Sequence, residues 1–319
     1  MQVLRDALRS ADLPYGPVLT IGNYDGIHLG QRKVLEKVVE RAKARSTEAA
    51  VVTFDPHPVS VLRPSEAPPR LTLDRQREAL LEEIGIDVLL IVRFTPEVAR
   101  MSAEGFVRRF LHGAMSVEEI YVGDDFVFGR ERGGDVADLQ RLGETLGFVA
   151  EGVDEATLGG DVISATRIRA AVAAGDAALA MDMLGRPYSL CGTVVQGDRM
   201  GARLGWPTIN LRPENEHLPH DGVYCGQVRF AHIPGAYDCV TNIGQRPTVY
   251  ENYQRVVESH ILDFHTDVYG EDVEVFFHKR LREEKLFPSV MDLSAQIARD
   301  VETAREYFAA RARRDQNSV

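Results

Sequence analysis

Long apolar runs and paired cysteines are both missing from the sequence. No stretch of about 18 apolar residues predicts a transmembrane helix, and residues 1–18 lack the apolar core of a signal peptide. We therefore expect a cytoplasmic protein with no membrane partner. Cys191, Cys225 and Cys239 show neither CxxC metal spacing nor the even number that disulfides require. We interpret them as buried thiols in a reducing compartment.

Basic residues are in deficit, and one common phosphate-binding motif is absent. The sequence holds 37 Lys and Arg against 48 Asp and Glu, which gives a net charge of −11. Because DNA and RNA are bound through clustered positive charge, we expect no nucleic-acid partner. No GxxxxGK[ST] loop occurs, so a nucleotide would bind through local backbone donors, a few cationic side chains and a magnesium ion.

Length and pattern predict two domains of different class. At 319 residues the chain exceeds the usual size of a single core. The first half alternates strand-like and helical runs, which is typical of an α/β fold with helices covering a parallel sheet. The expected strands are 18–21, 49–54, 88–94 and 119–122, and the expected helices are 33–44, 74–83 and 103–111.

The second half changes character after the helix-stopping sequence Gly185-Arg186-Pro187. Short alternating stretches divided by Gly, Pro, Asn and Asp predict a small antiparallel barrel or sandwich. Apolar residues at helical spacing from Val290 to Phe308 predict a C-terminal helix. We place the two domains at residues 1–185 and 186–319.

The segment TIGNYDGIHLGQRKVL, at residues 20–35, leads from an expected strand into an expected helix. Gly22 and Gly26 would let the backbone approach a ligand closely, and the free N–H groups of the helix start near Gly30 would form an anion site. His28 lies at this mouth, where a cationic imidazole would stabilise a phosphate in transfer. On local pattern alone, a plain turn with His28 on the surface explains the segment equally well.

Four blocks together resemble the HxGH nucleotidyltransferases, in the form of prokaryotic FAD synthetases. The segment above is similar to the GxFDGxHxGH signature, and TFDPHP (53–58), VGDDFVFG (122–129) and ISATRIR (163–169) follow in the family's order. The resemblance implies a Rossmann-like domain in which the phosphate of FMN attacks the α-phosphorus of ATP and expels pyrophosphate. No covalent intermediate is implied, so catalysis would come from positioning and charge stabilisation.

The same resemblance implies roles for individual residues. His28 would contact the phosphates in transfer, and Thr166 with the catalytic Arg169 would grip the triphosphate. The implied nucleotide-binding residues are Gly22, Asp25, Gly26, Gly30, Gln31, Ser164 and Thr166. The implied flavin-binding residues are Phe54, Pro56, Asp125, Phe126 and Phe128, whose aromatic surface suits a flavin ring.

Two positions depart from the family pattern. Gln31 stands at the second motif histidine, and Ala165 replaces the middle Ser of ISST. A glutamine amide can donate a hydrogen bond but carries no positive charge, and losing one charge-assisted contact to a transition state costs about 10²–10³ in rate. We expect slow but real adenylylation, and the alternative is a riboflavin kinase with an impaired or regulatory adenylyltransferase domain.

The segment GTVVQGDRMGARLGWPTINL, at residues 192–211, combines glycines with a pair of side-chain oxygens. Gly197, Gly201 and Gly205 suggest close approach to a phosphate. Thr208 and Asn210 project on one side of an extended segment and offer neutral oxygens to a hard cation. A turn with an Asx bond is the simpler alternative.

A carboxylate lies inside the mostly apolar run RVVESHILDF, at residues 255–264. If Glu258 faces a pocket, it is a natural general base for a substrate hydroxyl. If it faces water, it is part of a solvated strand face. The pattern alone leaves both readings open.

The second half closely resembles the riboflavin kinase family. Its motifs GxxxGxxLGxPTxN, GVY, NIGxRPT (within NIGQRPTVY, 242–250), VExHxLDF, YG and RLRxExxF occur in order. The resemblance implies that Glu258 deprotonates the ribityl 5′-hydroxyl for attack on the γ-phosphate of ATP, while Thr208 and Asn210 coordinate Mg²⁺. Segment 197–205 would fold over the nucleotide, and Arg280 would bind flavin. Ala202 stands where the family usually has Arg, and the role of the adjacent Arg203 stays open.

Taken together, the resemblances imply a bifunctional enzyme that makes FMN from riboflavin and FAD from FMN, with ATP as co-substrate and Mg²⁺ as cofactor. A flavin carrier without turnover has no use for Glu258 or for the Thr208 and Asn210 oxygens, and the acidic charge disfavours a nucleic-acid-binding barrel. His217 and His220, spaced HLPH, show no third metal ligand, and we interpret them as loop residues. The sequence predicts no oligomeric state.

Overall fold

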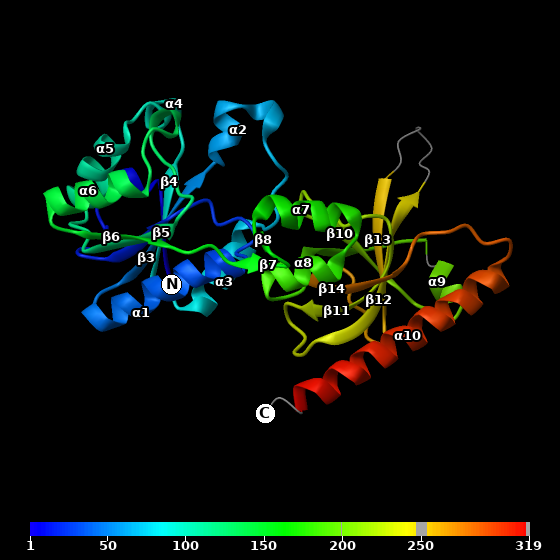
Figure 1. Ribbon diagram of the computed structural model, residues 1–319. Helices are drawn as coiled ribbons and strands as arrows, with labels where there is room; N and C mark the ends of the chain where they lie inside the picture. Colours follow the sequence, from blue (N-terminus) through cyan, green and yellow to red (C-terminus); the bar gives the residue numbers. More distant parts are fainter. Residues whose placement is uncertain (199, 247–253, 317–319) are drawn as a thin grey trace. The chain divides into compact units, whose positions relative to one another are not determined.

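The computed structural model describes residues 1–198, 200–246 and 254–316 (Figure 1). The chain divides into two compact units, Met1–Ala165 and Thr166–Val319. Helices α7 (Ala165–Ala174) and α8 (Ala177–Leu184) thereby group with the second unit. The functional domain limits of 1–185 and 186–319 stay a prediction.

The first unit is built on a six-stranded parallel sheet in the order β1-β4-β3-β2-β5-β6. The strands are β1 (Gln2–Arg5), β2 (Val18–Ile21), β3 (Ala49–Asp55), β4 (Val88–Arg93), β5 (Glu119–Gly123) and β6 (Val149–Val153). Consecutive residues of β4, such as Leu89 and Leu90, belong to different apolar clusters, as expected when both faces of a sheet are covered. The α/β prediction is confirmed.

Helices and short turns connect these strands. The α-helices are α1 (Leu29–Arg45), α2 (Pro58–Leu62), α3 (Asp74–Ile84), α4 (Pro96–Ala99), α5 (Ala103–Phe106) and α6 (Val136–Leu146). The shorter elements are the 3-10 turns η1 (Ala7–Arg9), η2 (Pro64–Glu66) and η4 (Arg130–Arg132), the π-helix η3 (Val107–His112), and a hairpin of β7 (Thr157–Leu158) and β8 (Asp161–Val162). The expected helix at 103–111 is therefore a short α-helix followed by a π-helical stretch.

Strand β2 sits at the point where the sheet reverses its order. Its neighbours are β3 on one side and β5 on the other, so the connections after β2 and after β5 leave in different directions. In open parallel sheets, ligands bind at the carboxyl ends of the strands beside such a switch point. The turn after β2, which carries His28, lies at that edge.

The second unit is a closed barrel of antiparallel strands in the order β10-β13-β12-β11-β14-β9. The strands are β9 (Tyr188–Val195), β10 (Ile209–Pro213), β11 (Gly222–Phe230), β12 (Tyr237–Arg246), β13 (Gln254–Ile261) and β14 (Asp272–Arg282). The barrel prediction is confirmed. A short helix, α9 (Met200–Arg203), precedes β10.

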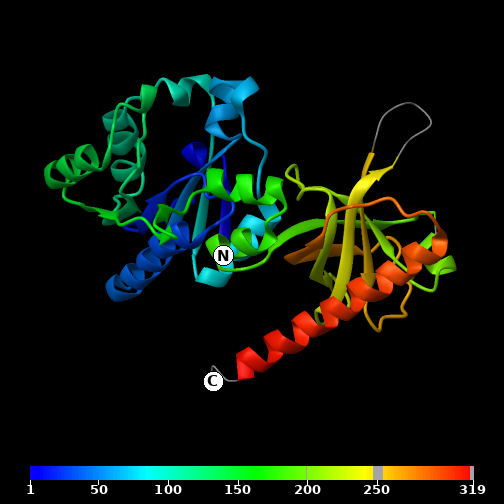
Figure 2. The same ribbon diagram turned by 45° about the vertical axis from the view of Figure 1, so that its right-hand side comes forward.

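Helix α10 (Val290–Gln316) lies along the side of the barrel (Figures 1 and 2). Its residues Val301, Ala304 and Phe308 share a buried cluster with Val223 and Val240 of the barrel. The three cysteines are free and buried, as expected. Within the described residues, no helix has both the length and the apolar character needed to cross a bilayer.

Candidate active sites

The turn from β2 to α1 presents His28 at the carboxyl edge of the sheet. His28 is the N-cap of α1 and is only 9% exposed. Its Nδ1 accepts a hydrogen bond from the Gln31 backbone N–H at 3.3 Å, and Gln31 Oε1 accepts from the His28 backbone N–H at 3.3 Å. The two side chains form a capping box. Because Nδ1 is the acceptor in this box, the neutral ring carries its proton on Nε2.

Two buried side chains anchor a strained part of the same turn. Tyr24 and Ile27 have φ values of 48° and 41°, a region that bulky residues rarely adopt. They are only 3% and 2% exposed. The Tyr24 hydroxyl lies 2.6 Å from Thr20 Oγ1, and burial raises the pKa of this phenol well above its usual value. Packing in the core therefore holds the backbone that presents His28.

Asp25 ties the turn to the segment that precedes α3. Its carboxylate accepts from the backbone N–H groups of Leu71 at 2.9 Å and Thr72 at 3.0 Å, and from Thr72 Oγ1 at 3.1 Å. The Gly26 N–H donates to the same hydroxyl at 3.2 Å. Sequence reasoning missed Thr72, which is 7% exposed, because only the tertiary fold brings residues this far apart in the chain together.

The expected aromatic residues lie at the carboxyl end of β3 and just after β5. Phe54 packs edge-to-face on Phe94 with ring centroids 5.7 Å apart, and Phe126 stacks on Phe128 at 5.2 Å. Phe54 and Phe126 are both partly buried against one core cluster, which leaves part of each ring accessible. Pro56 directly follows β3, and Asp125 precedes Phe126 after β5.

The ISATRIR block, at residues 163–169, spans the division between the two units. Ser164 belongs to the first unit, and Thr166 and Arg169 belong to the second, on α7. Within the second unit, the carbonyl of Arg169 lies 2.9 Å from Nε2 of His217.

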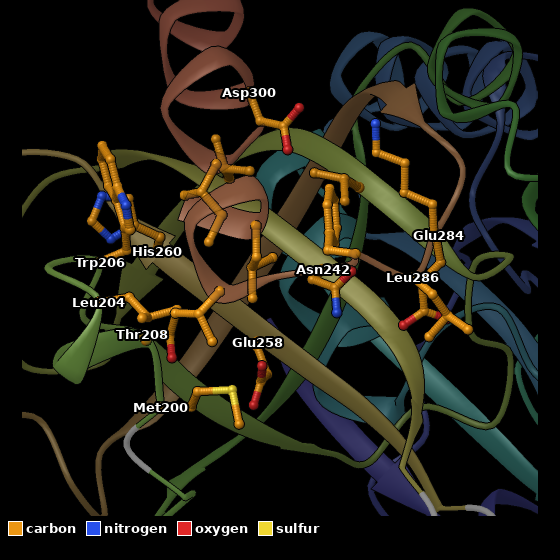
Figure 3. Close-up of a pocket in the computed structure, with 18 of the residues that line it drawn as sticks. Met200, Leu204, Trp206, Thr208, Asn242, Glu258, His260, Glu284, Leu286 and Asp300 are labelled. Carbon is orange, nitrogen blue, oxygen red and sulfur yellow. The ribbon is translucent and has the colours of Figure 1, made fainter. Parts of the chain in front are cut away.

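A cavity of about 450 Å³ opens in the second unit beside the barrel and the start of α10 (Figure 3). Its polar lining includes Thr208 and Glu258. The alternating pattern of β13 left open whether Glu258 faces a pocket or water, and in the structure it faces this cavity. Its apolar lining comprises Met200, Leu204, Trp206, Val223, Val240, Leu286, Phe287, Val290, Leu293 and Ile297. A mainly apolar recess with a few convergent polar groups is typical of a small-molecule site.

Glu258 stands in a row of polar side chains on three neighbouring strands. In the ladder register, Asn210 of β10 pairs with Glu258 of β13, which pairs with Asn242 of β12. Directly opposed residues project from the same face of a sheet, so the three side chains share one side of the barrel. Asn242 lines the cavity and was not singled out as a site residue. Residues 247–250 of the NIGQRPTVY motif lie outside the described residues.

The motif glycines bring the 197–205 segment close to the two candidate metal ligands. A Cβ built on Gly197 would lie 2.3 Å from Asn210 Nδ2, and one on Gly201 would lie 2.4 Å from the Trp206 carbonyl and 3.3 Å from Thr208 Oγ1. Gly205 instead has open space but a φ of 84°, which favours glycine. Gly201 lines the cavity, whereas Gly197, Gly205 and Asn210 are not among the described residues that line it.

An ion pair closes the wall beside α10. Arg282 of β14 donates to both carboxylate oxygens of Asp300, with a shortest distance of 2.8 Å, and its guanidinium lies over the Phe287 ring. Nearby, burial and the charge of Asp221 raise the pKa of Glu284. Arg280, the implied flavin contact, is not among the described residues that line the cavity. It donates to the Asp221 carbonyl at 2.6 Å.

Comparisons with known proteins cover both units. The family model described as FAD synthetase matches residues 11–167, and the one described as riboflavin kinase matches residues 184–308. The chain is 38% identical over 312 residues to the bifunctional riboflavin kinase/FMN adenylyltransferase of Escherichia coli strain K12, across 97% of this chain and 98% of that protein. The Haemophilus influenzae protein of the same name is 36% identical over 308 residues, across 97% and 99% of the two chains.

A solved structure also resembles nearly the whole chain. The structure, described as a macrolide-efflux protein from Streptococcus pneumoniae, has a TM-score of 0.86 and 26% sequence identity. The match covers 96% of this chain and 99% of that one.

Proposed function

The chain belongs to the bifunctional riboflavin kinase/FMN adenylyltransferase family, and we propose which of its residues perform the two reactions. The enzyme phosphorylates riboflavin to FMN with ATP, and it adenylylates FMN to FAD with a second ATP. We assign phosphorylation to residues 186–319 and adenylylation to residues 1–185.

Glu258 is the general base that we propose for the kinase reaction. The observation that carries this assignment is its place in the cavity lining together with Thr208. The carboxylate takes the proton of the ribityl 5′-hydroxyl, whose oxygen attacks the γ-phosphorus of ATP while ADP leaves. The apolar wall formed by residues such as Phe287 and Leu293 suits the flavin ring.

Thr208 and Asn210 are the ligands that we propose for Mg²⁺. Their hydroxyl and amide oxygens are hard neutral donors, and the Glu258 carboxylate lies in register beside Asn210. Among the described residues, no three His, Cys, Asp or Glu side chains form a metal cluster. This donor set fits Mg²⁺, which usually binds to one or two protein groups and takes its other ligands from phosphate and water. The bound ion would neutralise charge on the ATP phosphates.

His28 is the donor that we propose for the adenylylation reaction. Its Nδ1 is held in the capping box, so Nε2–H would donate to the phosphates while the FMN phosphate attacks the α-phosphorus of ATP and pyrophosphate leaves. The amide NH₂ group of Gln31 and the backbone N–H groups at the start of α1 would add further donors. Gly22, Asp25 and Gly26 lie in the turn before α1, and Gly30 lies in the first turn of that helix.

Ser164, Thr166 and Arg169 complete the proposed nucleotide contacts through the triphosphate. The hydroxyl groups and the guanidinium are donors suited to phosphate oxygens. This assignment rests on the match of the ISATRIR block to the family motif.

The flavin of FMN would bind against Phe54, Pro56, Asp125, Phe126 and Phe128 during adenylylation. The partly accessible rings of Phe54 and Phe126, which pack on one core cluster, support this assignment. For Arg280 we propose an indirect role in flavin binding. Its guanidinium donates to the Asp221 carbonyl and does not line the cavity, but Arg282, two residues further along β14, does.

We further propose that the enzyme works in the cytoplasm, which its three free thiols support.

Flavin-free protein incubated with riboflavin, ATP and Mg²⁺, with the products separated by chromatography, tests both halves. FMN appearing first and FAD later is the expected result. FMN that accumulates without FAD, even when FMN is supplied directly, would instead indicate a kinase whose adenylyltransferase domain is impaired by Gln31. No turnover of either flavin would overturn the proposal.

A further inference from the structure

The segment His217-Leu218-Pro219-His220-Asp221 lies between β10 and β11. Within the second unit it is hydrogen-bonded to α7 on one side and to the barrel on the other. Nε2 of His217 lies 2.9 Å from the Arg169 carbonyl, and the His220 backbone N–H donates to the Val172 carbonyl at 3.1 Å. Because a carbonyl only accepts hydrogen bonds, His217 is the donor, in its Nε2–H form. Two bonds therefore fasten the segment to α7.

Side chains from four strands of the barrel hold the other side of this segment. Tyr188 of β9 and Tyr224 of β11 each donate to a carbonyl of one of its histidines at 2.6 Å. Arg280 of β14 donates to the Asp221 carbonyl at 2.6 Å, and Arg255 of β13 donates to the Asp221 carboxylate at 2.9 Å. The segment is thus fixed to the barrel more firmly than a plain loop would be.

The end of α7 packs into the same corner. A Cβ built on Gly175, which has a φ of 77°, would lie 2.8 Å from Tyr224 Oη and 3.1 Å from both Arg280 Cδ and His220 Cβ. The helix end therefore cannot shift toward the barrel without displacing these side chains. The position of α7 is set by the barrel at its end and by His217 near its start.

From these contacts we propose that His217 is a positioning residue for adenylylation, and the proposal rests on the proposed function of Thr166 and Arg169 in binding ATP. The bond from His217 acts on the carbonyl of Arg169 itself, one turn from Thr166, so it fixes the direction of the first turn of α7. Of the described residues that line the 450 Å³ kinase cavity, none belongs to segment 217–221. Riboflavin phosphorylation should therefore proceed without this bond.

Steady-state kinetics of the full chain, with each flavin supplied separately, test this role. His217→Ala should raise KM for ATP in the adenylylation of FMN about three- to tenfold, the effect of one neutral hydrogen bond. KM and kcat for riboflavin phosphorylation should stay unchanged. His217→Gln, whose amide N–H can donate in the same direction, should restore KM for ATP. His220→Ala is the control on the same segment: it removes a ring that lies 3.2 Å from the Arg280 guanidinium but keeps the backbone bond to Val172, so KM for ATP in adenylylation should not change.

The outcomes separate this inference from the assignment on which it rests. If Arg169→Ala raises KM for ATP in adenylylation but His217→Ala does not, the positioning role is refuted while the ATP site stands. If Arg169→Ala and Thr166→Ala leave that KM unchanged, both proposals fall. Equal losses in the two reactions, in step with a lower Tm, would show that His217 only stabilises the fold and would refute the positioning role.

Discussion

Gly197 lies so close to the amide of Asn210 that one added methyl group should disable the kinase reaction. A Cβ at Gly197 would be 2.3 Å from Asn210 Nδ2 and 2.5 Å from its Cγ. Since non-bonded heavy atoms pack at about 3.5–4.0 Å, the Asn210 amide would have to move by about 1 Å or more. A displacement of about 1 Å in a positioned group can cost about 10²-fold in rate. We expect Gly197→Ala to lower kcat for riboflavin phosphorylation by about this factor.

The loss should also be specific and should depend on Asn210. Phosphorylation would be measured across a range of Mg²⁺ concentrations, with the adenylylation of supplied FMN as the internal control. Asn210→Ala removes the amide with which the new methyl group collides, so the double variant should be no slower than Asn210→Ala alone. Normal phosphorylation by Gly197→Ala, or losses that multiply in the double variant, would refute the reasoning.

Three further predictions concern single groups. Glu258→Gln keeps the shape but removes the base, and kcat for phosphorylation should fall about 10²–10⁴-fold while FMN adenylylation is unchanged; a loss below tenfold would contradict the assignment. Gln31→Glu keeps the side-chain oxygen that accepts from the His28 backbone N–H but replaces the NH₂ donor by a negative charge. The rate of adenylylation should therefore fall while Tm stays unchanged. An unchanged rate would show that the Gln31 amide does not contact the phosphates. Burial and the charge of Arg311 lower the pKa of His278 to about 4, below the value of about 6.5 expected in the unfolded chain. The unfolded state therefore binds more protons between these pH values, so the free energy of unfolding should fall as pH drops from about 6.5 toward 4. Urea unfolding at several pH values measures this fall. His278→Gln should show a shallower fall, and an identical slope in the variant would contradict this explanation.

The buried elements of the sheet were predictable because their sequence pattern is local. The run VLLIV in β4 is apolar on both faces and is buried on both faces, as a central parallel strand requires. The edge strands β1 and β6 were missed because they are only partly buried and show no apolar run. The predicted helix at 103–111 continues into a π-helix, a hydrogen-bond pattern that helical periodicity does not reveal.

The candidate residues of both sites came from short motifs, but their neighbours did not. Nothing local marked Thr72 as a partner of Asp25, because 47 positions separate them in the chain. The HLPH pattern predicts ordinary loop residues, whereas in the structure His217 and the backbone of His220 bond to α7.

The sequence by itself determined the order of the elements, the two fold classes and the residue types available for chemistry, since periodicity and motif spacing are properties of the chain alone. Only the tertiary structure decided which way Glu258 faces. The alternating pattern of β13 would allow the Glu258 side chain on either face of the strand. Which face lines the cavity depends on the side of the barrel that α10 and the residues before it cover. The ladder register then aligns Asn210, Glu258 and Asn242, because cross-strand pairing joins residues whose separation in the chain no local pattern encodes.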